Sequence, residues 1–380
     1  PKGSYKESDL NEIDKANIKT ILNVESERSK TENKNQDVFV ENYSFEEFIK
    51  GSKDNFVFSS SRIQKLKHFK IDWDRHEIFL WDKRGVSGWN YLTGKRFKVI
   101  NKAKGPIGLA PNNRLIAYQL NGEVVVENID DGSVLFSTPI ERPMHDNWIN
   151  TVNYFTKDET HFVTQVERGR LKVFNTSTGL LDDDVDFDYW GSRSNELRCT
   201  DTGSASITLI NSPIVETNDN QLIGILRDGL FVFPLDNPQK IKHLEFDDSD
   251  KRAGYCSISL SPNQEYLYAD PGFKRFIAQF YIDEIDSAQD ASQFFRGMVA
   301  PGKRDLRYIA TLKATDNFLF RGSTSSFGWI NLKDGASSGT KSFKGISGSS
   351  SDISVDKKML ALGDSRGFVV FKKFPPTTSE

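Results

Sequence analysis

The sequence predicts an all-β fold, a seven-bladed β-propeller preceded by an N-terminal helical and linker extension. Two observations lead to this prediction. From Phe56 onward, short apolar runs alternate with polar turns, and none approaches the roughly 18 residues of a membrane-spanning helix. A strand–turn–strand unit also recurs along the chain, which is typical of folds built from repeated sheets. The propeller is expected over residues 55–374, between an extension (1–54) and a polar tail (375–380).

The extension is polar and has few apolar residues. Its first 35 residues are rich in Lys, Glu, Asn and Ser. Ser8 or Asp9 would cap a marginal helix there, and the following residues 25–36 have almost nothing to bury, so we expect a solvated linker. The alternative is a helix that docks on another domain.

The clearest repeated element is a strand that ends in Asn, with Gly four positions later. It occurs at Asn90 with Gly94, Asn128 with Gly132, Asn175 with Gly179, and Asn331 with Gly335. An Asn side chain at the start of a turn can bond the backbone two residues on, and Gly readily takes the positive φ at its end. Each occurrence therefore predicts a strand followed by a tight turn.

A pair of strands joined by a polar turn precedes each third strand. Clear copies of the pair span residues 107–118, 152–164, 258–269 and 353–363, and weaker copies span 69–80, 207–225 and 309–320. The third strands are expected at 85–90, 123–128, 170–175, 229–233, 275–281, 326–331 and 367–372. Seven such units predict seven blades.

In their number and order, these units resemble the WD-repeat β-propeller family over about 320 residues, because blades of that family carry four strands over about 40–45 residues. Residues 110–118 and 261–269 resemble the family's strand–turn–strand, and the Asn units resemble its strand that ends in Trp-Asp. No Trp-Asp dipeptide ends a blade here, and no Gly-His pair opens one. The resemblance is therefore to a divergent member.

The resemblance implies that a strand from the N-terminal side closes the ring, because the last unit supplies only three strands. Residues 55–60 are the first candidate and residues 37–42 the second. Closure removes two exposed sheet edges. Two stretches are expected to be insertions between strands: the acidic residues 182–188, and residues 283–302, which could form a short helix on a blade edge.

Motifs for catalysis or metal binding are absent from the sequence. None of the five histidines pair at metal-ligand spacing, and neither HExxH, GxSxG nor a phosphate-binding loop occurs. His76 and His161 begin second strands, where a histidine is usually structural. The acidic stretches 182–188 and 245–250 lack the glycine of a calcium loop, so we expect solvated loops or an acidic lip for a basic partner. The prediction is no enzyme, no cofactor and no metal.

The resemblance instead implies a scaffold that binds a protein partner, as a domain or subunit of a larger assembly. A rigid face of loops lowers the ordering cost of association, and loops between blades offer aromatic and Arg anchors. The candidate contact residues are His145, Asp146, Asn147, Trp148, Trp190, Arg193, Arg252 and Tyr255. The chain has only two cysteines, Cys199 and Cys256, and no CxxC, which fits a reducing compartment, so we expect an intracellular location, cytoplasmic or nuclear.

An alternative is that the propeller binds nucleic acid or an anionic lipid or ligand through basic residues around the first blade. These residues are Lys65, Lys67, Lys70, Lys95, Arg96, Lys98, Lys102 and Lys104. The chain has 50 Lys and Arg against 53 Asp and Glu, a net charge of −3, so it lacks the domain-wide basic excess of most nucleic-acid binders. A solvated surface is the simpler interpretation of these residues.

Overall fold

The computed structural model describes residues 55–140 and most of residues 152–373, together with Glu47 and Ile49. The gaps after residue 152 are 168–169, 187–213, 226–228, 238–239, 246–256, 271–276, 289–294, 300–308, 324–325, 333–340, 343–347, 355–358 and 365. The predicted N-terminal helix, the second candidate closing strand at 37–42 and both cysteines lie outside the described residues. No helix among the described residues is long and apolar enough to cross a membrane.

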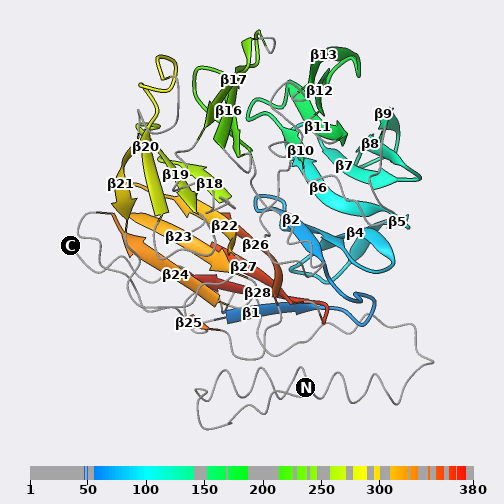
Figure 1. Ribbon diagram of the computed structural model, residues 1–380. Coiled ribbons are helices and arrows are strands. Elements are labelled where there is room, and N and C mark those ends of the chain that lie inside the picture. The colour runs from blue at the N-terminus through cyan, green and yellow to red at the C-terminus, as the bar shows by residue number, and fades with distance from the viewer. Residues whose placement is uncertain are drawn as a thin grey trace, which may run out of the picture.

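The described chain forms seven antiparallel four-stranded sheets arranged as the blades of a propeller (Figure 1). The first blade contains β2 (His68–Asp72), β3 (Glu77–Trp81), β4 (Gly85–Asn90) and β5 (Arg96–Asn101). The second contains β6 (Lys104–Ala110), β7 (Leu115–Leu120), β8 (Glu123–Asn128) and β9 (Val134–Pro139). The third contains β10 (Asn153–Phe155), β11 (His161–Glu167), β12 (Arg170–Asn175) and β13 (Leu181–Asp186).

The remaining blades repeat this order. The fourth contains β14 (Ile214–Glu216), β15 (Gln221–Ile225), β16 (Gly229–Pro234) and β17 (Lys242–Glu245). The fifth contains β18 (Ser257–Leu260), β19 (Tyr266–Asp270), β20 (Ile277–Tyr281) and β21 (Phe295–Val299). The sixth contains β22 (Ile309–Ala314), β23 (Phe318–Ser323), β24 (Ser326–Asn331) and β25 (Lys341–Ser342). The seventh contains β26 (Gly348–Ser354), β27 (Met359–Asp364), β28 (Phe368–Lys373) and β1 (Asn55–Ser59).

The ring closes through the pairing of β1 with β28, as the sequence predicts for residues 55–60. The two strands are antiparallel, with Phe56 opposite Phe371 and Phe58 opposite Val369. The first strand of each blade lies innermost, and β2 contacts both β6 of the second blade and β26 of the seventh. The seven-bladed all-β prediction is therefore confirmed.

The predicted turn chemistry is confirmed in the first three blades. The amide of Gly94 donates to the carbonyl of Asn90 at 2.9 Å, and Gly132 and Gly179 bond Asn128 and Asn175 in the same way. The Oδ1 atoms of all three Asn residues accept backbone N–H groups two or three residues on. The glycines have φ of 68°, 74° and 69°, which residues with a side chain rarely adopt. The fourth glycine, Gly335, lies outside the described residues.

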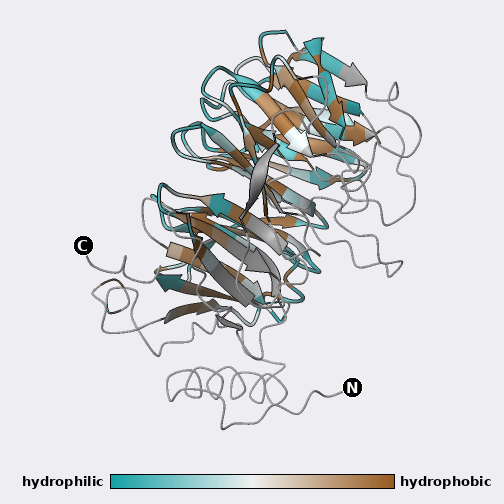
Figure 2. Ribbon diagram, turned by 60° about the vertical axis from the view of Figure 1, so that its left-hand side comes forward, coloured by the Kyte–Doolittle hydropathy of each residue, from teal (hydrophilic) through white to brown (hydrophobic). Residues whose placement is uncertain are grey.

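Apolar residues line the strands and hydrophilic residues fill the turns (Figure 2). Among the described residues the buried apolar side chains form seven clusters, and each cluster fills one interface between neighbouring blades. Between the second and third blades, for example, Val126 packs with Phe162 and Phe174. Because each blade shares its core with both neighbours, the ring is stabilised as a whole.

Two expectations from the sequence are wrong. Residues 181–186 form the outer strand β13 rather than an inserted loop, and the carboxylate of Asp184 pairs with Arg170 on the neighbouring β12. Residues 295–299 form the outer strand β21 rather than part of a helix, and Ile285 and Ala288 reach the core from turns. In both places the blade needs a fourth strand, and this tertiary pairing overrides the local preference.

We expect Phe58→Ala to lower the free energy of unfolding by about 3–5 kcal/mol, the usual cost of truncating a buried Phe. Phe58 is fully buried, and its ring packs edge-to-face with Trp89 of the first blade, with 5.9 Å between the ring centroids. The substitution therefore weakens the contact that joins the seventh blade to the first. Urea unfolding measures the change, with exposed Val134→Ala as a control expected within about 0.5 kcal/mol of the parent. Equal stabilities of the two variants would show that β1 contributes little to closure.

A second prediction concerns Asp352 on β26, whose Oδ2 accepts the backbone N–H of Ile71 at 3.1 Å across the closing interface. Burial raises the pKa of Asp352, against the opposing charges of Lys70 and Lys313. An acid with a raised folded-state pKa destabilises the fold when ionised, and this penalty disappears below its unfolded pKa of about 3.9. Asp352→Asn keeps an acceptor oxygen and removes the charge.

We therefore expect Asp352→Asn to be more stable than the parent at pH 7, with the difference shrinking toward pH 4. Thermal unfolding across this range measures it. A variant that is less stable by the same amount at every pH would mean that the hydrogen-bond geometry at Ile71, rather than the charge, dominates.

Candidate functional site

The eight predicted partner-binding residues lie outside the described part of the chain. His145, Asp146, Asn147 and Trp148 fall in the gap 141–151, Trp190 and Arg193 in 187–213, and Arg252 and Tyr255 in 246–256. Their role therefore stays a prediction.

The basic residues predicted around the first blade do not form one surface. The loops that enter the inner strands and the turns between second and third strands lie on one face of the ring, which we call the top face. We call the opposite face the bottom face. Lys65, Lys67, Lys102 and Lys104 belong to the top face, whereas Lys95 and Arg96 lie at the β4–β5 turn on the bottom face. The blade itself thus separates the two groups.

The other two predicted basic residues have positions within the sheet. Lys70 is half-buried on the inner strand β2. The ammonium of Lys98 pairs with Glu127 at 2.7 Å and donates to the carbonyls of Asn128 and Ile129 at 3.1 Å. Because these partners belong to the second blade, Lys98 joins two blades rather than facing a ligand.

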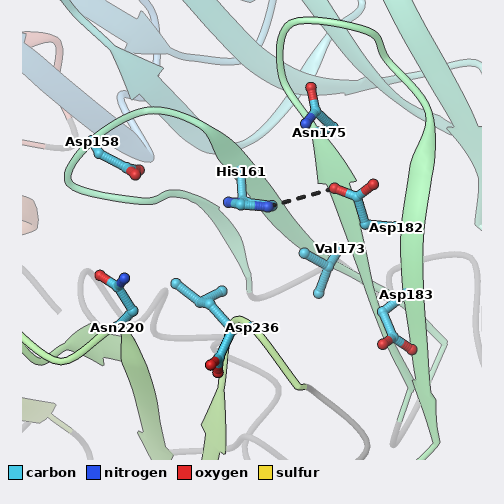
Figure 3. Close-up of a pocket in the computed structure, with 9 residues that line it drawn as sticks. Asp158, His161, Val173, Asn175, Asp182, Asp183, Asn220 and Asp236 are labelled. Carbon is cyan, nitrogen blue, oxygen red and sulfur yellow. Dashed lines mark ion pairs between the residues drawn. The ribbon is translucent and has the colours of Figure 1, made fainter.

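A cleft of about 490 Å³ lies on the bottom face between the third and fourth blades (Figure 3). It is lined by Asp158, His161, Val173, Asn175, Asp182, Asp183, Asn220, Leu235 and Asp236. The third blade contributes the β10–β11 turn and the ends of β11, β12 and β13, and the fourth blade contributes the turns after β14 and β16. Side chains distant in the chain therefore meet at one blade junction.

The β10–β11 turn, which lines one side of the cleft, keeps the carboxyl group of Asp158 ionised. Its Oδ1 accepts the hydroxyl of Thr156 at 2.6 Å and the backbone N–H of Thr160 at 3.0 Å. Partial burial acts to raise the pKa of Asp158, but these hydrogen bonds outweigh burial and keep the pKa below its ordinary value. Asp158 is therefore ionised at neutral pH.

His161 and Asp182 face each other on the third-blade side of the cleft (Figure 3). The Nε2 of His161 lies 3.5 Å from Asp182 Oδ2, and its Nδ1 lies 2.8 Å from the hydroxyl of Thr160. The His161 ring therefore contacts Thr160 and Asp182 of its own blade, and it also lines the cleft. With four aspartates against one histidine, the cleft attracts a cation, and Val173 and Leu235 add apolar wall.

The nine lining residues include no Ser, Cys or Lys that could act as a nucleophile. Within the described residues, no group of three His, Cys, Asp or Glu side chains is placed to hold a metal ion. The carboxylates and hydrogen-bonding groups of the lining can bind a cationic group. No sequence motif indicates this grouping, because its members are separated along the chain by up to the length of one and a half blades.

Four exposed aliphatic side chains gather beside the cleft, on the outer rim of the second and third blades. Val134 and Leu135 on β9 are 59% and 39% exposed, and Leu180 and Leu181 at the start of β13 are 67% and 47% exposed. We call these four residues the rim patch.

Contacts between the second and third blades bring the rim patch together. A Cβ placed on Gly179, next to Leu180, would lie 3.3 Å from the carbonyl oxygen of Leu135. Leu181 pairs with Phe174, whose ring stacks on Phe136 of β9 at 4.8 Å. The two pairs of aliphatic residues therefore lie at the outer strands of neighbouring blades, and Asp182 of the cleft follows directly after Leu181.

Comparison with known proteins gives no assignment for this chain. No model of a protein family matches the sequence, and no curated protein matches it either.

Proposed function

We propose that this chain is a divergent WD-repeat propeller and acts as a non-catalytic scaffold for a protein partner, as a domain or subunit of a larger assembly. The observation that carries the proposal is the rim patch beside the acidic cleft. Large apolar side chains gathered on an otherwise polar surface are characteristic of interaction sites. The order of the seven repeated units and the Asn–Gly turns support the family assignment.

The chemistry of the two neighbouring surfaces defines the partner segment. The rim patch favours aliphatic or aromatic side chains, because burying them removes apolar area from water on both partners. The cleft favours an Arg or Lys side chain, since Asp158, Asp182 and Asp236 surround its opening. Leu181 serves the second-blade side of the third blade and Asp182 its fourth-blade side, so a segment that crosses the outer end of this blade, with an apolar and a basic residue spaced apart, can reach both surfaces.

We expect a selection from a random peptide library displayed on phage to enrich such apolar–basic segments. Leu180→Ser combined with Asp236→Asn should weaken binding of a selected peptide by about tenfold or more, because it removes one apolar contact and one charge. Titration of the peptide, followed by fluorescence anisotropy, measures the affinity.

The matched control is Val99→Ser combined with Asp316→Asn, which removes an exposed apolar group and an exposed carboxylate from the first and sixth blades. It should leave the affinity unchanged. Enrichment of acidic peptides, or equal losses in the two double variants, would contradict the proposed site.

A further inference from the structure

Six exposed basic side chains gather on the top face of the first blade, away from the rim patch and the cleft. They come from the loop before β2, the β3–β4 turn and the β5–β6 connection. We call them the basic cluster: Lys65, Lys67, Lys83, Arg84, Lys102 and Lys104. Four of them belong to the basic stretch predicted from the sequence, and the structure adds Lys83 and Arg84.

Backbone hydrogen bonds fix the three segments of the basic cluster against one another. The amide of Lys83 donates to the carbonyl of Gln64 at 2.8 Å, which joins the β3–β4 turn to the loop before β2. The amide of Lys102 donates to the carbonyl of Arg84 at 2.8 Å, which joins the same turn to the β5–β6 connection. The six cations therefore originate from one rigid platform.

Trp81 supports one side of this platform. Its indole is buried, and the ammonium of Lys67 lies 4.8 Å from the ring centroid. A Cβ placed on Gly105, the neighbour of Lys104, would lie 2.5 Å from the same indole. Lys67 and Lys104 therefore project from backbone that packs around one aromatic ring.

The carboxylate within the platform does not neutralise the cluster through ion pairs. Asp82 is buried, and its oxygens accept the backbone N–H groups of Gln64 at 2.8 Å, Arg84 at 2.7 Å and Gly85 at 3.3 Å. Among the described residues, no carboxylate forms an ion pair with any of the six side chains. Gathering like charges is unfavourable, and a bound anion would relieve this repulsion.

The side-chain types indicate the class of anion. Five of the six are Lys, which binds phosphate as a point charge. None of the exposed large apolar side chains of the described residues belongs to the cluster, so it offers no aromatic platform for stacked nucleotide bases. We propose that the basic cluster binds a small, multiply phosphorylated molecule, free in solution or as the headgroup of a membrane lipid.

The first test is calorimetric titration with inositol hexakisphosphate. We expect binding by the parent chain, and a loss of about tenfold or more in Lys83→Ala/Arg84→Ala/Lys102→Ala, since each cation lost removes a charge-assisted contact. The control Lys95→Ala/Lys157→Ala/Lys240→Ala removes the same charge from exposed positions on the bottom face and should change the affinity less than twofold. Lys83→Arg/Lys102→Arg should retain binding.

Separate arms of the experiment distinguish the sources of the phosphate. Flotation with phosphatidylcholine vesicles that contain phosphatidylinositol bisphosphate should show binding that the soluble phosphate displaces if the ligand is a headgroup. Vesicle binding that is absent while the soluble phosphate binds would assign the site to a free molecule. Both outcomes support the proposal.

Three results would overturn the proposal: no binding of inositol hexakisphosphate, equal loss in the top-face and bottom-face variants, or binding of a single-stranded RNA oligonucleotide alone. Leu180→Ser should bind the phosphate like the parent, so failure of the partner site and failure of this site are distinguishable.

Discussion

The pairing of β1 with β28 is the interaction on which the rest of the structure depends. Each hydrophobic cluster lies between two blades, so a blade has a complete core only when both neighbours are present. Without β1 the seventh blade would have three strands and would lose Phe56 and Phe58 from the cluster that joins it to the first blade. Closure thus converts a row of sheets, each with open interfaces, into a ring without an end.

Polar contacts between blades extend this constraint to the bottom face. Glu159 of the third blade accepts the backbone N–H groups of Asn112 and Asn113 in the second, at 3.0 and 2.7 Å. Glu216 of the fourth blade accepts the N–H of Lys157 in the third at 2.7 Å. The third and fourth blades therefore each fix the first turn of the blade before them. The turn that carries Asp158 is one of these, so the groups that shape the cleft also hold the ring together.

The blades could be predicted from local sequence patterns, whereas the candidate surfaces could not, because they depend on tertiary contacts. The Asn–Gly turns identified strand ends because Asn accepts backbone N–H groups within a turn and Gly adopts the positive φ at its end. The predicted third strands at 85–90, 123–128, 170–175 and 326–331 coincide with β4, β8, β12 and β24. In contrast, nearness in sequence grouped Lys95 with Lys102, which the blade places on opposite faces, and it left out Lys83. Outer strands were also missed. For example, β13 is an acidic run without an apolar pattern, and it forms a strand because it pairs with β12.

The two proposed surfaces share a rigid frame but not a face. The acidic cleft opens on the bottom of the third and fourth blades, and the basic cluster lies on the top of the first, so the small net charge of −3 conceals a strongly uneven distribution. A partner in one site leaves the other open, because no residue belongs to both. A ring whose blades share every core also resists deformation, so we expect the described blades to transmit little change from one surface to the other. The two proposals together describe a scaffold that holds two ligands independently, with their separation fixed by the propeller itself.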